Sequence, residues 1–217
     1  MLAKVKNFKR IFNAGIIAVI RADSMEQALA TTEAVRNGGV DIIEITLTVP
    51  GALGVIEELT KTYRQNEILI GAGTVIDPET ARISLLAGAE FVVSPSLNHD
   101  VLRLCNRYQK ICMPGCMTVT EIVSALEAGA DLIKLFPGSC FDPSIIKTLK
   151  GPLPQAEFVP TGGVNLDNVQ DWIHNGCIAV GIGGELTKGA AEGDYQGVTE
   201  TARQFVEKIR AVRPLQA

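Results

Sequence analysis

The chain has 217 residues, of which 47% are hydrophobic and 20% are charged, as in ordinary globular domains. Its formal net charge of −4 argues against an electrostatic surface for nucleic acid, and no long basic block stands out. The five cysteines form no CxxC pair and the two histidines are not spaced as ligands. We therefore expect no disulfide framework, no metal site and no cofactor.

The first long apolar run, residues 14–20, predicts a strand rather than a membrane segment. It is too short to span a bilayer, and it ends at Arg21. No small-residue cleavage site follows, which argues against a signal peptide. We expect a cytoplasmic protein without a membrane partner.

Short β-rich segments recur along the chain with helical patterns between them. Helices are predicted to begin at capping signals such as Asp77-Pro78 and Thr118-Val119-Thr120-Glu121, and to end at glycines. The predicted strands are residues 16–21, 41–46, 68–73, 90–94, 111–114, 131–136, 157–161 and 178–182.

Apolar strands that alternate with amphipathic helices indicate a parallel sheet covered by helices. Eight such units in a chain of this length predict an α/β fold of the (β/α)₈ TIM barrel type. We expect a single domain over residues 1–217, with a short helix before the first strand. A doubly wound open sheet is the alternative, but it does not require eight evenly spaced units.

Chemically active residues collect where the predicted strands end, which is the end of this fold that carries active sites. Lys134 is the strongest signal, because it interrupts the apolar run Asp131–Phe136. Desolvation inside such a strand favours the neutral amine, and a neutral amine is a nucleophile. The alternative is a lysine that extends to solvent or pairs with a carboxylate.

Glu44 occupies the corresponding position of the second predicted strand. Because side chains alternate along a strand, Glu44 and Lys134 can face the same central cavity. A lysine and a carboxylate in one cavity suit Schiff-base chemistry, in which the amine attacks a ketone and the carboxylate transfers protons. A buried structural ion pair is the competing interpretation.

Two glycine-rich turns follow the last two predicted strands, Thr161-Gly162-Gly163 and Gly181-Ile182-Gly183-Gly184. Glycine lets backbone N–H groups approach an anion closely, and barrels of this class often bind phosphate at these turns. Together the two turns predict a phosphate-binding end of the cavity.

These residues resemble a known family, the class I 2-keto-3-deoxy-6-phosphogluconate and 4-hydroxy-2-oxoglutarate (KDPG/KHG) aldolases. The resemblance covers essentially the whole chain. It rests on the ordered strings Glu44-Ile45-Thr46-Leu47, Gly71-Ala72-Gly73-Thr74, Ser94-Pro95, Lys134-Leu135-Phe136-Pro137 and Pro160-Thr161-Gly162-Gly163.

The resemblance implies a metal-independent lyase that cleaves KDPG reversibly to pyruvate and glyceraldehyde 3-phosphate, as in the Entner–Doudoroff pathway. It makes Lys134 the Schiff-base lysine and Glu44 the general acid–base, and it implies a homotrimer. The pyruvate pocket would be lined by Thr74, Pro95 and Phe136. The distal hydroxyl and phosphate end would be held by Thr161, Gly162, Gly163, Gly183 and Gly184.

Two positions depart from the family pattern. Many members carry an arginine for the keto-acid carboxylate at the position of Thr48, and we hypothesise that Arg21 supplies this cation instead. Many members also carry a phosphate-binding serine at the position of Gly184. Glu185 follows it, and we expect Glu185 to face outward from the next helix.

Other activities are compatible with the same residues. Cleavage of 4-hydroxy-2-oxoglutarate, or of the galactonate epimer of KDPG, would need the same catalytic pair. A phosphosugar isomerase or epimerase would use Glu44 as a base and Lys134 as an electrostatic partner. A non-catalytic ligand-binding barrel would not need to keep both Lys134 and Glu44.

Overall fold

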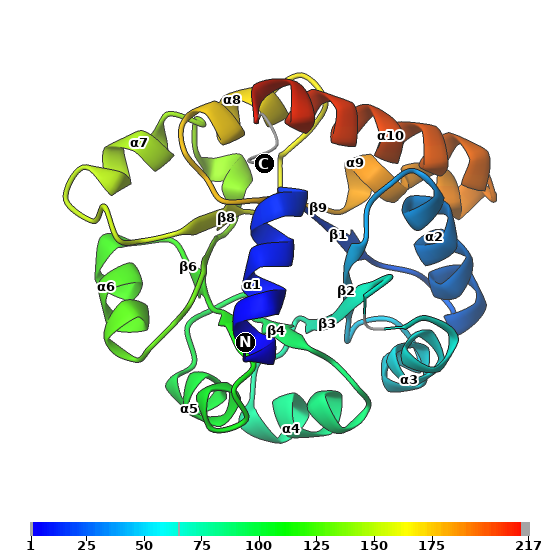
Figure 1. Ribbon diagram of the computed structural model, residues 1–217, viewed down its shortest axis with the longest axis horizontal. Coiled ribbons are helices and arrows are strands. Elements are labelled where there is room, and N and C mark those ends of the chain that lie inside the picture. The colour runs from blue at the N-terminus through cyan, green and yellow to red at the C-terminus, as the bar shows by residue number, and fades with distance from the viewer. Residues whose placement is uncertain (1, 65, 214–217) are drawn as a thin grey trace.

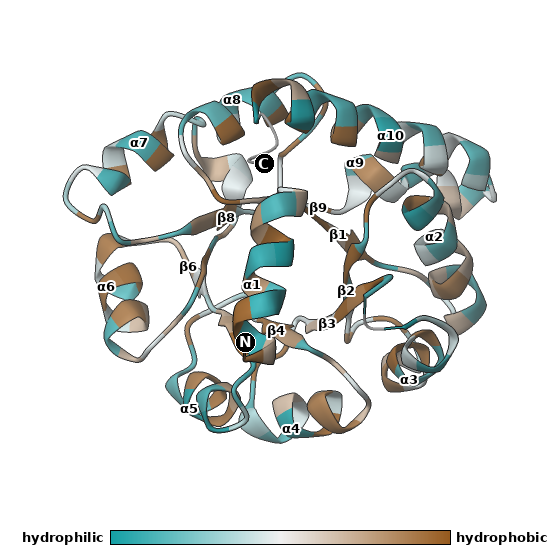
Figure 2. Ribbon diagram, viewed as in Figure 1, coloured by the Kyte–Doolittle hydropathy of each residue, from teal (hydrophilic) through white to brown (hydrophobic). Residues whose placement is uncertain are grey.

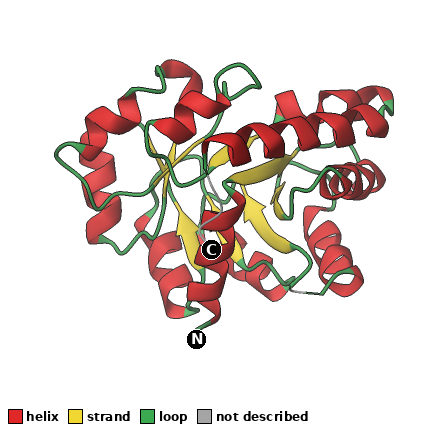
Figure 3. Cartoon of the chain, turned by 45° about the horizontal axis from the view of Figure 1, so that its top comes forward, coloured by secondary structure: helices red, strands yellow, loops and turns green. Residues whose placement is uncertain are grey.

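The computed structural model describes residues 2–64 and 66–213. The strands lie in the middle of the molecule and the helices surround them (Figure 1), an α/β arrangement that the turned view also shows (Figure 3). The strands are β1 (Ile16–Ile20), β2 (Ile42–Thr46), β3 (Leu69–Gly73), β4 (Phe91–Val93), β5 (Ile111–Met113), β6 (Gly115–Cys116), β7 (Ile133–Leu135), β8 (Phe158–Pro160) and β9 (Val180–Ile182).

Each strand predicted from the sequence contains an observed strand, and the helices lie between them as expected. The α-helices are α1 (Ala3–Ala14), α2 (Met25–Asn37), α3 (Ala52–Thr62), α4 (Pro78–Leu86), α5 (His99–Arg107), α6 (Val119–Glu127), α7 (Ile145–Lys150), α8 (Val169–His174), α9 (Gly184–Thr187) and α10 (Tyr195–Val212). Two short 3₁₀ helices span Gly138–Cys140 and Lys188–Glu192.

The predicted helix-start signals form real caps. The Asp77 carboxylate accepts a hydrogen bond from the Thr80 N–H, directly before Pro78 in α4. Thr118 and Glu121 form a reciprocal capping box at the start of α6. Local sequence therefore fixes where these helices begin.

Neighbouring strands run parallel in two curled sheets. The larger has the order β5-β4-β3-β2-β1-β9 and the smaller has the order β6-β7-β8. Pro114 separates β5 from β6, because proline has no N–H to donate to a ladder. The predicted strand 111–114 is thus followed by β6, which the sequence reasoning missed. On the other side of the smaller sheet, Thr161, directly after β8, forms a parallel bridge with Gly181 of β9.

Apolar side chains fill two separate cores. The larger core lies between strands and helices and includes Ile45, Trp172 and Phe205. The smaller core includes Ile17 and Phe91, on strand faces turned away from those helices, together with residues of α1. The strands are mostly hydrophobic in Figure 2, as expected for strands covered on both faces.

Helix α1 covers the N-terminal ends of the strands. Its Ile11 is fully buried in the smaller core. Lys4 pairs with Asp131 at 2.9 Å, just before β7, and Arg10 pairs with Asp41 at 2.9 Å, just before β2. This end of the strand assembly is therefore closed by apolar contacts and by ion pairs.

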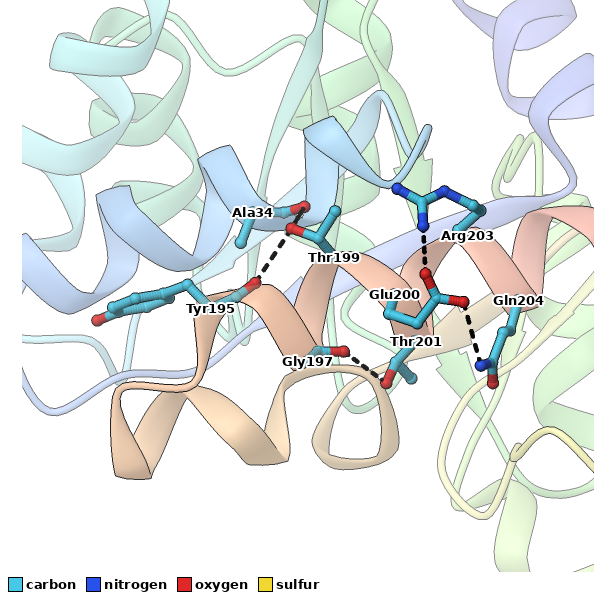
Figure 4. Close-up of polar contacts among 8 residues, drawn as sticks. All are labelled: Ala34, Tyr195, Gly197, Thr199, Glu200, Thr201, Arg203 and Gln204. Atoms are coloured by element: carbon cyan, nitrogen blue, oxygen red, sulfur yellow. Dashed lines mark hydrogen bonds and ion pairs between the residues drawn. The ribbon is translucent and has the colours of Figure 1, made fainter.

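Helix α10 packs along α2 in a polar contact shown in Figure 4. Thr199 donates from its hydroxyl to the Ala34 carbonyl at 2.9 Å and to the Tyr195 carbonyl at 3.0 Å. Glu200 pairs with Arg203 on the same helix. The hydrogen bond from Thr199 to Ala34 joins the last helix to α2, on the outside of the strands.

Within the described residues, none of the helices combines the length and the hydropathy needed to cross a membrane.

Candidate active site

Glu44 of β2 and Lys134 of β7 come together although they belong to different sheets. The Lys134 Nζ atom lies 4.0 Å from Glu44 Oε1. Lys134 is 4% exposed and Glu44 is 2% exposed. The chain thus places an amine and a carboxylate side by side in a buried region, where neither would be found without a partner or a function.

The Glu44 carboxylate is incompletely satisfied. Oε1 is buried and has no hydrogen-bond partner within the described protein. The 4.0 Å separation from Lys134 is longer than a hydrogen bond. Buried polar atoms are normally paired, so an unpaired carboxylate oxygen facing an amine is free to receive a hydrogen bond from a reactant.

Phe136 connects this pair to a cavity. The Lys134 Nζ atom lies 5.0 Å from the centroid of the Phe136 ring. Phe136 also lines a cavity of about 80 Å³ beside the C-terminal ends of β1, β8 and β9. The amine and the cavity therefore share one aromatic wall.

Seven of the predicted site residues line this cavity: Arg21, Phe136, Thr161, Gly162, Gly163, Gly183 and Gly184. The remaining lining residues are Gly181, which belongs to the predicted glycine turn, and Val19, Val164 and Glu185, which were not expected to line the site. Each of them is a close sequence neighbour of a predicted residue, which is the signal that could have identified them.

Thr74 and Pro95 follow β3 and β4 and are half-buried. Thr74 has a φ of 62°, an unusual backbone conformation for a threonine. Neither residue lines the 80 Å³ cavity. The structure thus puts both at the expected end of the strands, outside the lining of this cavity.

Arg21 is exposed and lies over the end of β9. Its Nη1 atom would lie 3.4 Å from a Cβ atom placed on Gly183. Thr48, at the position where many family members carry arginine, is exposed, and its hydroxyl lies 2.9 Å from that of Thr46. Arg21 is the one arginine or lysine among the residues that line this cavity.

Glu185 lies at the rim of the cavity and pairs with Lys188 at 3.7 Å. Its side chain is largely exposed. The exposure of Glu185 and its pairing with Lys188 agree with the outward orientation expected from the sequence. The residue also contributes to the lining of the cavity.

A larger cavity of about 480 Å³ lies at the other end of the strands, between α1 and α10. Its Arg213 is stacked on Phe12 at 4.1 Å and donates to the Ile178 carbonyl at 2.6 Å. Its Asp41 is paired with Arg10. Among the described residues that line this cavity, Asp41 is the one carboxylate and there is no lysine, so the cavity offers no amine for a Schiff base.

Two of the cysteines, Cys116 and Cys177, are poor competitors for the role of nucleophile. Burial raises the pKa of the Cys116 thiol and of the Cys177 thiol to about 12. Both therefore stay protonated near neutral pH, whereas a reactive cysteine needs the thiolate form. Among the described residues, no group of three or more His, Cys, Asp or Glu side chains is arranged to hold a metal ion.

Comparison with known proteins agrees with this geometry. The model of the KDPG and KHG aldolase family matches residues 8–201. The 2-dehydro-3-deoxy-6-phosphogalactonate aldolase of Escherichia coli is 37% identical over 91% of this chain and 94% of its own length.

Two solved structures are similar over most of the chain. One is a KDPG aldolase from Legionella pneumophila with pyruvate captured as a covalent carbinolamine, with a TM-score of 0.82 and 30% identity over 94% of this chain and 97% of the other. The second is a protein cage designed by fusing symmetric oligomeric domains, with a TM-score of 0.84 and 35% identity over 91% and 73% of the two chains. With a family model that spans most of its length and relatives of this similarity, the chain belongs to the KDPG and KHG aldolase family.

Proposed function

We propose that the protein is a class I aldolase that cleaves KDPG reversibly to pyruvate and glyceraldehyde 3-phosphate, as in the Entner–Doudoroff pathway. The observation that carries the proposal is the buried pair of Lys134 and Glu44, 4.0 Å apart, against the wall of a cavity that also holds Arg21. A Schiff-base lysine agrees with the covalent carbinolamine that the Legionella relative forms with pyruvate.

The proposed reaction begins at Lys134. Its free amine attacks the C2 ketone to give a carbinolamine, which loses water and becomes a protonated imine. Loss of the proton from the C4 hydroxyl breaks the C3–C4 bond, and the bonding electrons move into the imine to give an enamine and an aldehyde. Protonation at C3 and hydrolysis then release pyruvate and restore Lys134. The iminium acts as the electron sink, so the proposal needs no metal.

Glu44 is proposed to move the protons in this sequence. Its unpaired Oε1 can accept a proton from the carbinolamine nitrogen or from the C4 hydroxyl, and can return it when water leaves or re-enters. The carbinolamine nitrogen is the Lys134 nitrogen itself, and the C4 hydroxyl of the bound substrate would lie near it during the reaction. One carboxylate at 4.0 Å from that nitrogen is therefore placed to serve several steps, directly or through one water.

The cavity is proposed to bind the two charged ends of the substrate. Arg21 would hold the carboxylate of the keto acid, because a guanidinium matches a carboxylate with two hydrogen bonds. Thr161 and the glycine turns would hold the distal hydroxyl and the phosphate. Thr74 and Pro95 are proposed to complete the pyruvate pocket from the ends of β3 and β4.

Cleavage of the galactonate epimer is a second candidate function. The relative from Escherichia coli that is 37% identical carries that activity in its name. The two substrates differ at one stereocentre, and the same catalytic pair would serve both.

Pyruvate release, coupled to lactate dehydrogenase, tests the substrate directly. We expect KDPG to be cleaved with a kcat/KM at least about tenfold above that of 4-hydroxy-2-oxoglutarate, because the latter lacks the phosphate end. A higher kcat/KM for the galactonate epimer than for KDPG would favour the second candidate function. No pyruvate from any of the three compounds would overturn the proposal.

We further propose that the two sheets form one closed (β/α)₈ barrel in a single domain. If β5 and β6 are one strand interrupted at Pro114, they join the sheets on one side, and the Thr161–Gly181 bridge supports closure on the other. We also propose a cytoplasmic location, because charged phosphosugars do not cross membranes unaided.

A homotrimer is proposed for the assembly. Among the exposed apolar side chains of the described residues, three lie in α4 or just before it: Ile76 at 59%, Ile83 at 46% and Leu86 at 67%. Ile83 borders a groove of about 350 Å³ that is lined by Leu47, Val49 and Leu53 among others. Exposed apolar side chains beside an apolar groove are a feature of many protein interfaces.

Native mass spectrometry tests the assembly. We expect three times the chain mass of 23.2 kDa, and conversion to monomers by Leu86→Glu. Glu207→Lys, on α10, serves as the control and should leave the trimer intact. A monomer of the unmodified protein at micromolar concentration would contradict the trimer.

A further inference from the structure

Gly73 occupies a position where any side chain would collide with the Glu44 carboxylate. A Cβ atom on Gly73 would lie 2.6 Å from Glu44 Cδ and closer still to Oε1. Real Cβ contacts are essentially never under 3.0 Å. The carboxylate group of Glu44 therefore lies directly against the backbone of the neighbouring strand.

The strand register explains the contact. Gly71 of β3 lies opposite Glu44 of β2, and Gly73 lies opposite Thr46. Gly71 and Gly73 point to the same face of β3 because side chains alternate. A Cβ atom on Gly71 would instead meet the ring of Phe91. Along this face β3 contributes no side chain at two successive positions, and Phe91 and Glu44 fill the two spaces.

The backbone of Gly73 does not need glycine for its own conformation. Its φ lies outside the left-handed range, whereas several other glycines of the chain have positive φ. Alanine is therefore compatible with the backbone, and the reason for glycine is the space above it. In addition, Glu44 Oε1 has no hydrogen-bond partner that could hold it in place.

From these contacts we infer that Gly73 is a positioning residue for Glu44. The missing side chain sets the conformation in which Oε1 lies 4.0 Å from Lys134 Nζ. This inference rests on the proposed acid–base role of Glu44. A displacement of a catalytic group by about 1 Å can cost roughly 10²-fold in rate, which is the effect expected from a methyl group at position 73.

Thermal unfolding tests the contact without any measurement of activity. Gly73→Ala should lower the Tm, and Glu44→Ala in the same chain should restore most of the loss, because it removes the atoms that collide. Gly71→Ala is the matched control: it should also lower the Tm, but Glu44→Ala should not restore it. If Gly73→Ala fails to fold, the Gly73→Ala/Glu44→Ala double variant should still fold. Equal behaviour of the two glycine variants would overturn the inference.

Steady-state kinetics test the positioning role. Gly73→Ala should lower kcat by roughly 10²-fold and change KM by less than about threefold, because the carboxylate is displaced while the binding cavity is intact. In a Glu44→Gln background the same substitution should cost less than about threefold, since the acid–base group is already gone. An additive loss in that background, or full activity of Gly73→Ala, would contradict the inference.

The two proposals fail in different ways. If pyruvate forms no reducible adduct on Lys134 of the unmodified protein, the proposed function fails. If the adduct forms but the effects of Gly73→Ala and of the Glu44 substitutions are additive, both in Tm and in kcat, only the role of Gly73 fails.

Discussion

At the N-terminal ends of the strands, charged side chains form close ion pairs, whereas at the C-terminal ends Glu44 and Lys134 lie beyond hydrogen-bond distance of each other. Lys110 pairs with Glu90 at 2.7 Å, and Lys150 pairs with Glu157 at 3.0 Å. The same end is covered by α1 and its buried Ile11. The buried pair at the opposite end is looser, at 4.0 Å.

This difference separates residues that support the fold from residues that are available for chemistry. A satisfied ion pair at partial exposure contributes little and reacts with nothing. A buried amine beside an incompletely satisfied carboxylate is costly to maintain, and a reaction gives a reason for that cost. Substitutions at one end, each with a control at the opposite end, test this difference.

The largest effect is expected from Lys134→Ala. It should lower aldol cleavage by roughly 10⁴-fold or more, because no other group can form the imine. Lys150→Ala, which removes an ion pair at the opposite end, is the control and should keep normal turnover. Pyruvate release and far-UV circular dichroism measure the two effects. Substantial cleavage by folded Lys134→Ala would contradict the assignment.

Glu44→Gln should have the next largest effect. We expect kcat to fall by roughly 10²–10⁴-fold, because the amide keeps the shape but cannot transfer protons. Glu90→Gln is the matched carboxylate at the other end, where it accepts from Asn7 at 3.0 Å and pairs with Lys110. It should change stability and leave kcat near normal. Normal turnover of Glu44→Gln would remove its proposed role.

Arg21→Ala should raise the KM for the keto acid by about 10–100-fold, as expected when a charged hydrogen-bonding partner is lost from a binding site. The effect on kcat should be smaller. The control is Arg10→Ala, whose side chain pairs with Asp41 at the N-terminal ends. An unchanged KM in Arg21→Ala would show that another group binds the carboxylate.

The smallest effect is expected from Lys4→Ala, which removes the half-buried pair with Asp131. The free energy of unfolding should fall by about 1 kcal/mol, and kcat should not change. Urea denaturation and the pyruvate assay measure the two quantities. A loss of kcat without a loss of stability would mean that the N-terminal ends of the strands contribute to catalysis, which contradicts the separation of the two ends.

Much of this arrangement could be predicted from the sequence, because it depends on local patterns. Lys134 stands out within an apolar strand, and the caps at Asp77 and Thr118 mark where helices begin. The continuation of β5 as β6 was not predicted, because a proline, here Pro114, usually marks the end of a strand.

Apart from the pairing of Glu44 with Lys134, contacts between strands could not be predicted from the sequence. The lateral contact between Glu44 and Gly73 depends on the register of β2 and β3. Likewise, the place of Glu185 at the rim of the cavity depends on how α9 leaves β9. The sequence predicted which residues collect at one end, but not which of them touch.

The most direct test of the account is reduction with sodium borohydride in the presence of pyruvate, followed by intact mass and peptide mapping. We expect one adduct per chain, of the mass expected for reduced pyruvate imine, on the peptide that carries Lys134. No adduct on the folded protein, or an adduct on a different lysine, would contradict it, and an isomerase or epimerase that uses Glu44 as its base would then be the better explanation.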